Sequence, residues 1–123
     1  MQGRPNKRKL GSEKERVAGK YLEQQGYTVL EYNFYSHGGE IDIVAKDSKG
    51  TYVMCEVKYR SSTSYGEPVE AVNYYKQKNI SHATLYYYLR HQMPTDTPCR
   101  FDVIGIERDG TITHIKDAFS FCE

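Results

Sequence analysis

The sequence predicts a single α/β domain in which a mixed central sheet, including an antiparallel hairpin, packs between two helices. Strand-like alternation of apolar and ionisable residues covers residues 38–44 and 53–60. Helix-like spacing of apolar residues covers residues 15–25 before them and residues 73–90 after them. At 123 residues, the chain can enclose one hydrophobic core but not two. These observations together favour one domain of the α/β class.

The first ten residues concentrate positive charge and contain glycine, proline and asparagine, which are poor helix and strand formers. We therefore expect residues 1–10 to form a flexible basic N-terminal arm and residues 11–123 to form the folded domain. Such an arm either contacts nucleic-acid phosphates or only keeps the chain soluble, and the sequence leaves both roles open. Its cations are Arg4, Lys7, Arg8 and Lys9.

Two elements are expected before the alternating strands. Residues 15–25 are predicted to form the first helix, because their apolar side chains recur at helical spacing and Gly26 follows as a stop. Residues 27–35 are predicted to form the first strand of the sheet.

The two alternating strands are joined by the sequence Asp47-Ser48-Lys49-Gly50, whose residues tolerate tight and left-handed turns. A loop of three residues would make the pair an antiparallel hairpin in which Asp42 faces Glu56. The same register sets Glu40 opposite Lys58. A slip of one residue would send the two acidic sets to opposite faces of the sheet. The register therefore decides whether these side chains form one site.

The second half of the chain begins with a polar loop at residues 61–66, which could close over a substrate. Residues 73–90 follow as the long second helix. Residues 100–107 and 111–115 are predicted to form a final hairpin around Asp109-Gly110, which is a strong turn signal.

Five tyrosines lie on the predicted second helix. Aromatic rings can stack on exposed bases, but tyrosines at helical spacing beside aliphatic residues more often pack in a core or at an interface. We therefore predict packing roles for Tyr74, Tyr75, Tyr86, Tyr87 and Tyr88.

The predicted hairpin places Asp42 and Glu56 on one half-buried face with Val44 and Met54, while Ile41 and other apolar residues cover the opposite face. Opposed carboxylates repel, and desolvating each costs on the order of several kcal/mol unless a cation compensates. Oxygen ligands favour Mg²⁺ or Mn²⁺, whereas the cysteines and histidines lack the paired spacing of a zinc site. The alternative is a solvated strand face on which acids pair with neighbouring cations.

Two carboxylates, a hard divalent cation and one lysine suit hydrolysis of a phosphodiester bond. The metal would neutralise a non-bridging phosphate oxygen and lower the pKa of a bound water, while Lys58 orients that water or steadies the developing charge. The spacing of Asp42, Glu56 and Lys58 is the arrangement of the PD-(D/E)xK nuclease superfamily, although this short pattern by itself is loose.

A longer match is more specific. The string Gly39-Glu40-Ile41-Asp42, followed by residues 55–60, resembles the GEID and VEVKxR motifs of the YraN-like family, a branch of that superfamily similar in fold to archaeal Holliday-junction resolvases. The resemblance implies a restriction-endonuclease-like fold and an Mg²⁺- or Mn²⁺-dependent, endonuclease-like phosphodiesterase acting on DNA, including branched or structured DNA. It covers nearly the whole chain, and the further matching segments are residues 10–18, Tyr21-Leu22, Lys76-Gln77, residues 100–104 and residues 115–119.

The predicted site residues have distinct roles. Asp42 and Glu56 would hold the metal and Lys58 would position the water. The resemblance implies that Glu15 supplies a further catalytic acid, which acts through a water or a second metal. Glu40 would support Lys58 or the surroundings of the metal. The residues expected to bind substrate are Gln77, Lys76 and Arg60.

Composition excludes few functions. No apolar run approaches the ~20 residues of a membrane span, and the N-terminus lacks an apolar signal region, so we expect a cytoplasmic protein without a membrane partner. Three cysteines without framework spacing fit a reducing compartment. The net charge of +1 argues neither for nor against nucleic acid.

The main alternative is a nucleic-acid-binding or scaffolding protein that keeps the nuclease fold without turnover. Retention of Asp42, Glu56 and Lys58 favours an enzyme. Hydrolysis of a small phosphorylated metabolite is a third reading, but the chain has no glycine-rich loop to build a closed phosphate pocket. Monomer and homodimer both stay open as assembly states.

Overall fold

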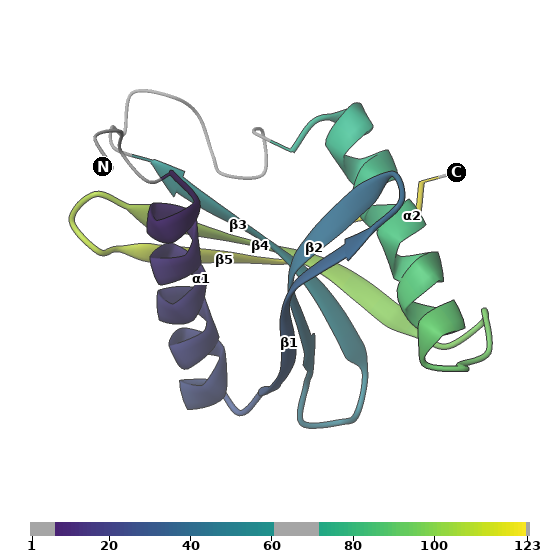
Figure 1. Ribbon diagram of the computed structural model, residues 1–123. Coiled ribbons are helices and arrows are strands. Elements are labelled where there is room, and N and C mark those ends of the chain that lie inside the picture. Colours follow the sequence, from purple (N-terminus) through teal and green to yellow (C-terminus); the bar gives the residue numbers. More distant parts are fainter. Residues whose placement is uncertain (1–6, 61–71, 123) are drawn as a thin grey trace.

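The structure, a computed structural model, describes residues 7–60 and 72–122, with side chains from residue 12 onward (Figure 1). It confirms a single α/β domain with a mixed sheet and two helices, an arrangement consistent with a restriction-endonuclease-like fold. None of the helices in these ranges is long and apolar enough to cross a membrane. The elements are α1 (Lys7–Gln24), β1 (Thr28–Ser36), β2 (Gly39–Lys46), β3 (Tyr52–Arg60), α2 (Tyr74–Arg90), β4 (Cys99–Glu107) and β5 (Ile112–Phe119).

The five strands lie in the order β1-β2-β3-β4-β5. All neighbours are antiparallel except β3 and β4, which pair in parallel. Two parallel neighbours need a crossover connection, and the segment of chain that contains α2 provides it. The predicted final hairpin is confirmed, and Gly110 takes a left-handed φ of 93° in its turn.

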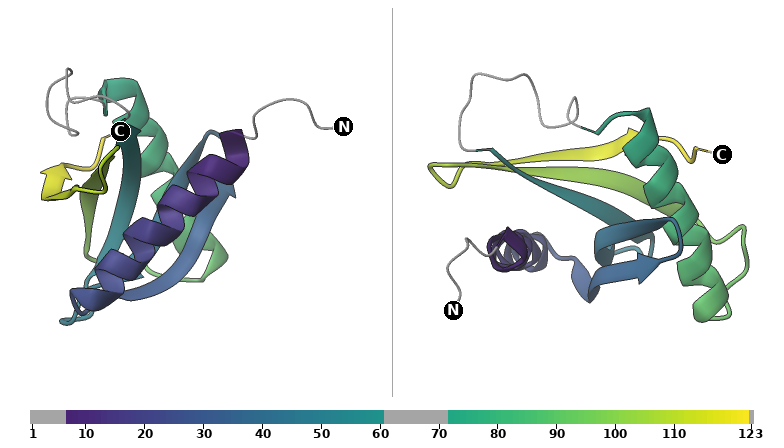
Figure 2. Two further views of the ribbon diagram at one scale, coloured as in Figure 1. Left: turned by 90° about the vertical axis from the view of Figure 1, so that its left-hand side faces the viewer. Right: turned by 45° about the horizontal axis from the view of Figure 1, so that its top comes forward.

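The two helices cover opposite faces of the sheet, as Figures 1 and 2 show. Ala18 and Leu22 of α1 pack on alternate residues of the central strands, including Cys55. Ile80 and Ala83 of α2 pack on the other set. Because successive strand residues point to opposite faces, one central strand contributes to both clusters. The sheet is therefore buried from both sides at its centre.

The predicted register of the β2–β3 hairpin is confirmed where the two strands pair. Val44 lies opposite Met54, and the ladder ends at Ile43 and Cys55. The predicted pairs Asp42–Glu56 and Glu40–Lys58 are therefore not formed, because the two strands separate one position before Asp42 and Glu56. The loop is the predicted three-residue one. The Asp47 N–H donates to the Thr51 carbonyl at 2.9 Å, and Gly50 takes a left-handed φ of 88°.

The predicted face of Ile41 is wrong. Ile41 does not share the α1-side cluster with Ile43 but packs with Phe34 and Ile80 on the α2 side. The physical reason is visible in Figure 1, where β2 leaves β3 and bends with β1 toward α2. This bend changes the direction of side chains beyond the end of the ladder, and it opens a fork between β2 and β3.

The N-terminal boundary of the first helix differs from the prediction. The first helix begins at Lys7 rather than at residue 15, because lysine, arginine and leucine are strong helix formers. Residues 7–10 of the predicted arm are therefore helical, while residues 1–6 and the polar loop at residues 61–66 lie outside the described residues. The second helix starts as predicted, with the side chain of Asn73 accepting from the Lys76 N–H.

The structure confirms core packing for two of the five tyrosines, and interface packing of the other three stays a prediction. Tyr87 and Tyr88 are buried in the α2-side core. Tyr74 and Tyr75, however, are 63% and 71% exposed, and Tyr86 is also exposed. Helical spacing alone was misleading because α2 packs on the sheet along one face only, and Tyr74, Tyr75 and Tyr86 lie on its opposite, exposed face.

Gly39 marks the closest approach between the β1–β2 hairpin and α2. A Cβ atom at this position would meet the backbone carbonyl oxygen of Asn79, which cannot rotate away. We expect Gly39→Ala to push the hairpin off the helix and lower the free energy of unfolding by about 1–3 kcal/mol. Denaturant unfolding measures this, with Ser48→Ala in the exposed β2–β3 turn as a control. Equal stability of Gly39→Ala and the wild type would contradict the contact.

Candidate functional site

The predicted acids gather at the fork where β2 separates from β3. Asp42 and Glu56 are only 6% and 3% exposed there, although both are ionisable. Each influences the pKa of residues from both helices, namely Glu15 on α1 and Lys76 on α2. The fork thus brings together side chains from β2, β3, α1 and α2.

Asp42 occupies an unfavourable position for a negative charge. Its Oδ2 accepts a hydrogen bond of 2.8 Å from the Val57 N–H. Burial, reinforced by the charge of Glu56, nevertheless raises the pKa of Asp42 to about 8. At neutral pH this carboxyl group therefore retains a proton unless a cation compensates its charge.

Glu56 has two cationic partners. Its Oε2 lies 3.3 Å from the Nζ of Lys58 and 3.2 Å from the Nζ of Lys76. Burial alone would lower the pKa of Lys76, but the Glu56 carboxylate outweighs this effect and raises it. Because Lys58 lies on the same strand and Lys76 on α2, this shared oxygen connects β3 to the first turn of the helix.

Glu15 reaches the same cluster from α1. Burial raises the pKa of Glu15, a hydrogen bond from Asn33 partly offsets this, and the charge of Glu40 raises it further. The Glu15 Oε1 accepts from the Asn33 Nδ2 at 2.7 Å. The predicted grouping of Glu15 and Glu40 with Asp42 and Glu56 is therefore present in the structure.

Sequence reasoning missed Asn33. It lies in the middle of β1 with a left-handed φ of 54°. Its neighbours in β1 pair with the residues on either side of Asp42 in β2, so Asn33 lies level with Asp42. Asparagine tolerates this backbone conformation better than most residues, and its amide holds Glu15. The available signal was an asparagine, which is uncommon in strands, between two aromatic residues of a predicted strand.

Two variants separate the roles of Asn33. Asn33→Gly keeps the left-handed backbone at low cost, whereas Asn33→Ala strains it, so we expect the alanine variant to be less stable by about 1 kcal/mol. Both lose the amide, which should raise the pKa of Glu15 further because the hydrogen bond lowers it. Denaturant unfolding and carboxyl NMR titration measure the two effects. Equal stabilities would show that the backbone at residue 33 is not strained in solution.

Two of the predicted substrate-binding residues have other partners. The Gln77 Nε2 donates to the Val72 carbonyl at 2.9 Å, at the start of α2. The Arg60 Nη2 lies 2.8 Å from the Glu107 Oε2, at the ends of β3 and β4. Lys76, by contrast, lies within the cluster. Of these three contacts, all in the described part of the chain, that of Lys76 reaches the pair Asp42 and Glu56.

The chemistry of the fork fits a hard divalent cation bound by few protein ligands. In the two described stretches, no three His, Cys, Asp or Glu side chains form a complete ligand set. Mg²⁺, however, commonly uses one or two carboxylates and fills its other positions with water and substrate oxygens. The mutual repulsion of Asp42 and Glu56 is the repulsion that such an ion would relieve.

Fold and site together define a small α/β protein with a buried pair of carboxylates and adjacent lysines at a strand fork. The chain belongs to the family described as "Uncharacterised protein family UPF0102", whose family model matches residues 14–106. This span includes Glu15, Asp42, Glu56, Lys58 and Lys76.

Individual relatives match over nearly their whole length. A "UPF0102 protein" of Geobacter metallireducens is 50% identical over 113 residues, covering 89% of this chain and 91% of the relative. One from Lachnoclostridium phytofermentans is 44% identical over 114 residues, covering 93% and 95%. One from Pelobacter propionicus is 46% identical over 121 residues, covering 94% and 86%.

Proposed function

We propose that this protein is a metal-dependent nuclease of the PD-(D/E)xK superfamily that hydrolyses nucleic-acid phosphodiester bonds, with branched or structured DNA as the expected substrate. The observation that carries the proposal is the buried pair Asp42 and Glu56 at the fork, with the Lys58 amine on Glu56. Burying two acids together is costly, so a site that retains them indicates a use for their charge.

Asp42 and Glu56 would hold Mg²⁺ or Mn²⁺. When bound, such an ion neutralises phosphate charge and lowers the pKa of water. Lys58, partly exposed beside Glu56, is positioned to steady the negative charge that develops on the phosphate. Glu15, whose pKa is raised by burial, is suited to accept a proton through an intervening water.

The raised pKa of Asp42 implies competition between protons and metal. Metal ligands must be deprotonated, so binding at this carboxylate releases a proton near neutral pH. The apparent affinity for Mg²⁺ should therefore increase as the pH rises toward about 8.

The test is cleavage of branched, flapped, single-stranded and duplex DNAs, and of matching RNAs, with Mg²⁺ and Mn²⁺. Calorimetry and thermal unfolding in parallel should show metal binding and a raised melting temperature. Metal binding with no cleavage of any substrate would contradict the enzyme and favour a binding role. If the protein binds neither Mg²⁺ nor Mn²⁺, the proposal that Asp42 and Glu56 share a metal ion is wrong.

One observation favours the alternative of a non-catalytic nucleic-acid-binding or scaffolding protein. Glu56 is already neutralised by two ammonium groups, so its burial does not by itself require a metal ion. Asp42 has no such cation among the causes of its raised pKa, and this difference is why the enzyme is preferred.

We place the protein in the cytoplasm in this proposal. All three cysteines are free thiols, which suits a reducing compartment that also holds nucleic acid.

A further inference from the structure

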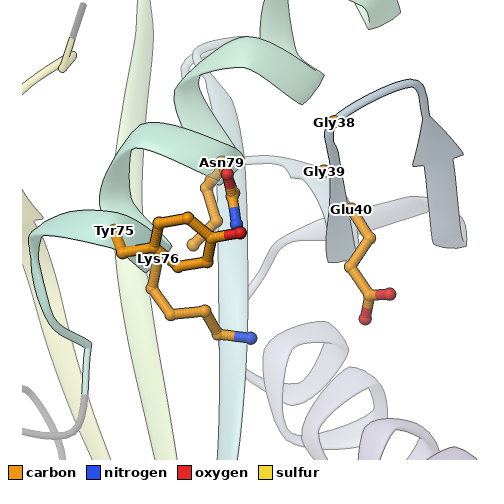
Figure 3. A pocket seen from close by; sticks show the side chains of 7 residues that line it. Gly38, Gly39, Glu40, Tyr75, Lys76 and Asn79 are labelled. Atoms are coloured by element: carbon orange, nitrogen blue, oxygen red, sulfur yellow. The ribbon is translucent and has the colours of Figure 1, made fainter.

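A pocket of about 460 Å³ adjoins the acidic cluster, between the β1–β2 turn and the first turns of α2. Gly38, Gly39 and Glu40 line one side, and Tyr75, Lys76 and Asn79 line the other (Figure 3). Gly38 leaves open space where a side chain would stand, while Gly39 lies against the Asn79 carbonyl oxygen. The pocket lies at the smaller end of ligand sites, a size that suits one nucleotide unit rather than a double helix.

Tyr75 supplies an aromatic surface at this pocket. It is 71% exposed, whereas Tyr87 and Tyr88 on the same helix are buried in the core. Figure 3 shows its ring beside the Lys76 and Asn79 side chains. These three groups suit an unpaired nucleotide. An exposed aromatic ring stacks on the base, a lysine neutralises the phosphate, and an amide forms hydrogen bonds with the edge of the base.

The charged residues of the pocket determine where a phosphate could bind. Lys76 connects it to the fork, because its Nζ lies 3.2 Å from the Glu56 Oε2. Glu40 points away from the Tyr75 ring toward α1 in Figure 3 and repels phosphate from that side. A nucleotide with its base on Tyr75 would therefore carry its phosphate at Lys76, next to the buried acids.

We propose that this pocket binds one unpaired nucleotide beside the phosphodiester to be cut. The proposal rests on the proposed nuclease function and deepens it, because it names the substrate class as nucleic acid with a single-stranded or displaced nucleotide at the cutting position. Paired bases stack on one another, so their faces are not available to Tyr75.

Binding without metal tests the pocket independently of cleavage. The probe is an oligonucleotide with one 2-aminopurine, either unpaired in a gap or fully paired in a duplex, in DNA and RNA versions, with EDTA present. The full chain should quench the unpaired probe by stacking. Tyr75→Ala should remove the quenching and weaken binding of the unpaired probe by about 5-fold to 100-fold, with little effect on the duplex.

Two variants control the comparison. Tyr75→Phe keeps the aromatic face and should bind like the wild type. Tyr86→Ala removes another exposed tyrosine of α2, which lines a separate groove with Leu85 and Leu89, and should also leave binding unchanged. Unchanged binding by Tyr75→Ala, or an equal loss in Tyr86→Ala, would overturn the pocket assignment.

The outcomes separate the two proposals. Tyr75-dependent binding by a protein that cuts no substrate would support the pocket and overturn the nuclease. Metal-dependent cleavage that does not change in Tyr75→Ala, with unchanged binding, would support the nuclease and overturn the pocket assignment.

Discussion

Asp42→Asn is expected to abolish metal-dependent cleavage and the rise in melting temperature that Mg²⁺ produces. The change removes one of the two carboxylates that would hold the ion while keeping the shape of the side chain and an oxygen for the Val57 N–H. Activity should fall by at least about 10²-fold. Cleavage assays and thermal unfolding with and without Mg²⁺ measure both losses.

The same variant should be more stable than the wild type in the absence of metal near neutral pH. The unfolded pKa of aspartate is about 4, and the folded pKa of Asp42 is raised to about 8. Between these values the folded state binds more protons, so the free energy of unfolding of the wild type decreases as pH rises. One pKa unit corresponds to about 1.4 kcal/mol, so the effect of Asp42 is on the order of a few kcal/mol. Asp42→Asn should have a smaller pH slope, and the remainder comes from Glu15, whose pKa is also raised by burial.

Asp96→Asn is the matched control, because Asp96 is exposed and distant in sequence from the fork. It should retain the metal response and the pH slope of the wild type. A wild-type stability that does not decrease between pH 4 and 8 would contradict the burial of a protonated Asp42.

Lys58→Ala is expected to reduce cleavage by about 10²-fold or more while changing DNA affinity only a few-fold. The structure explains why this variant should fold. Lys76 remains 3.2 Å from the Glu56 Oε2, so the buried carboxylate keeps one cation when Lys58 is removed. Single-turnover cleavage and equilibrium binding must be measured at one salt concentration, because phosphate contacts depend strongly on salt.

Lys76→Ala provides the comparison. Since Lys76 lines the pocket of Figure 3, its loss should weaken DNA binding more than the loss of Lys58 does. If Lys58→Ala instead reduces binding and cleavage by the same factor, Lys58 is a phosphate anchor and its proposed catalytic role is wrong.

Features that depend only on neighbouring residues could be predicted from the sequence. The Asp47–Gly50 turn and the alternation on both sides of it predicted the loop and the pairing of Val44 with Met54, which the structure confirms. Helical spacing predicted α2, although the cap that Asn73 forms was not predicted. These signals are local because turn chemistry and side-chain alternation act over a few residues.

The lining of the fork, in contrast, depends on contacts between residues that are distant in the chain. Glu15 and Asn33 are 18 positions apart and meet because α1 crosses β1 at that point. The ion pair of Lys76 with Glu56, the position of Ile41 and the exposure of Tyr75 depend likewise on where β2 bends and on which face of α2 packs against the sheet. Periodicity says that a helix or strand has an apolar side, but the packing of distant elements decides which of its residues are covered.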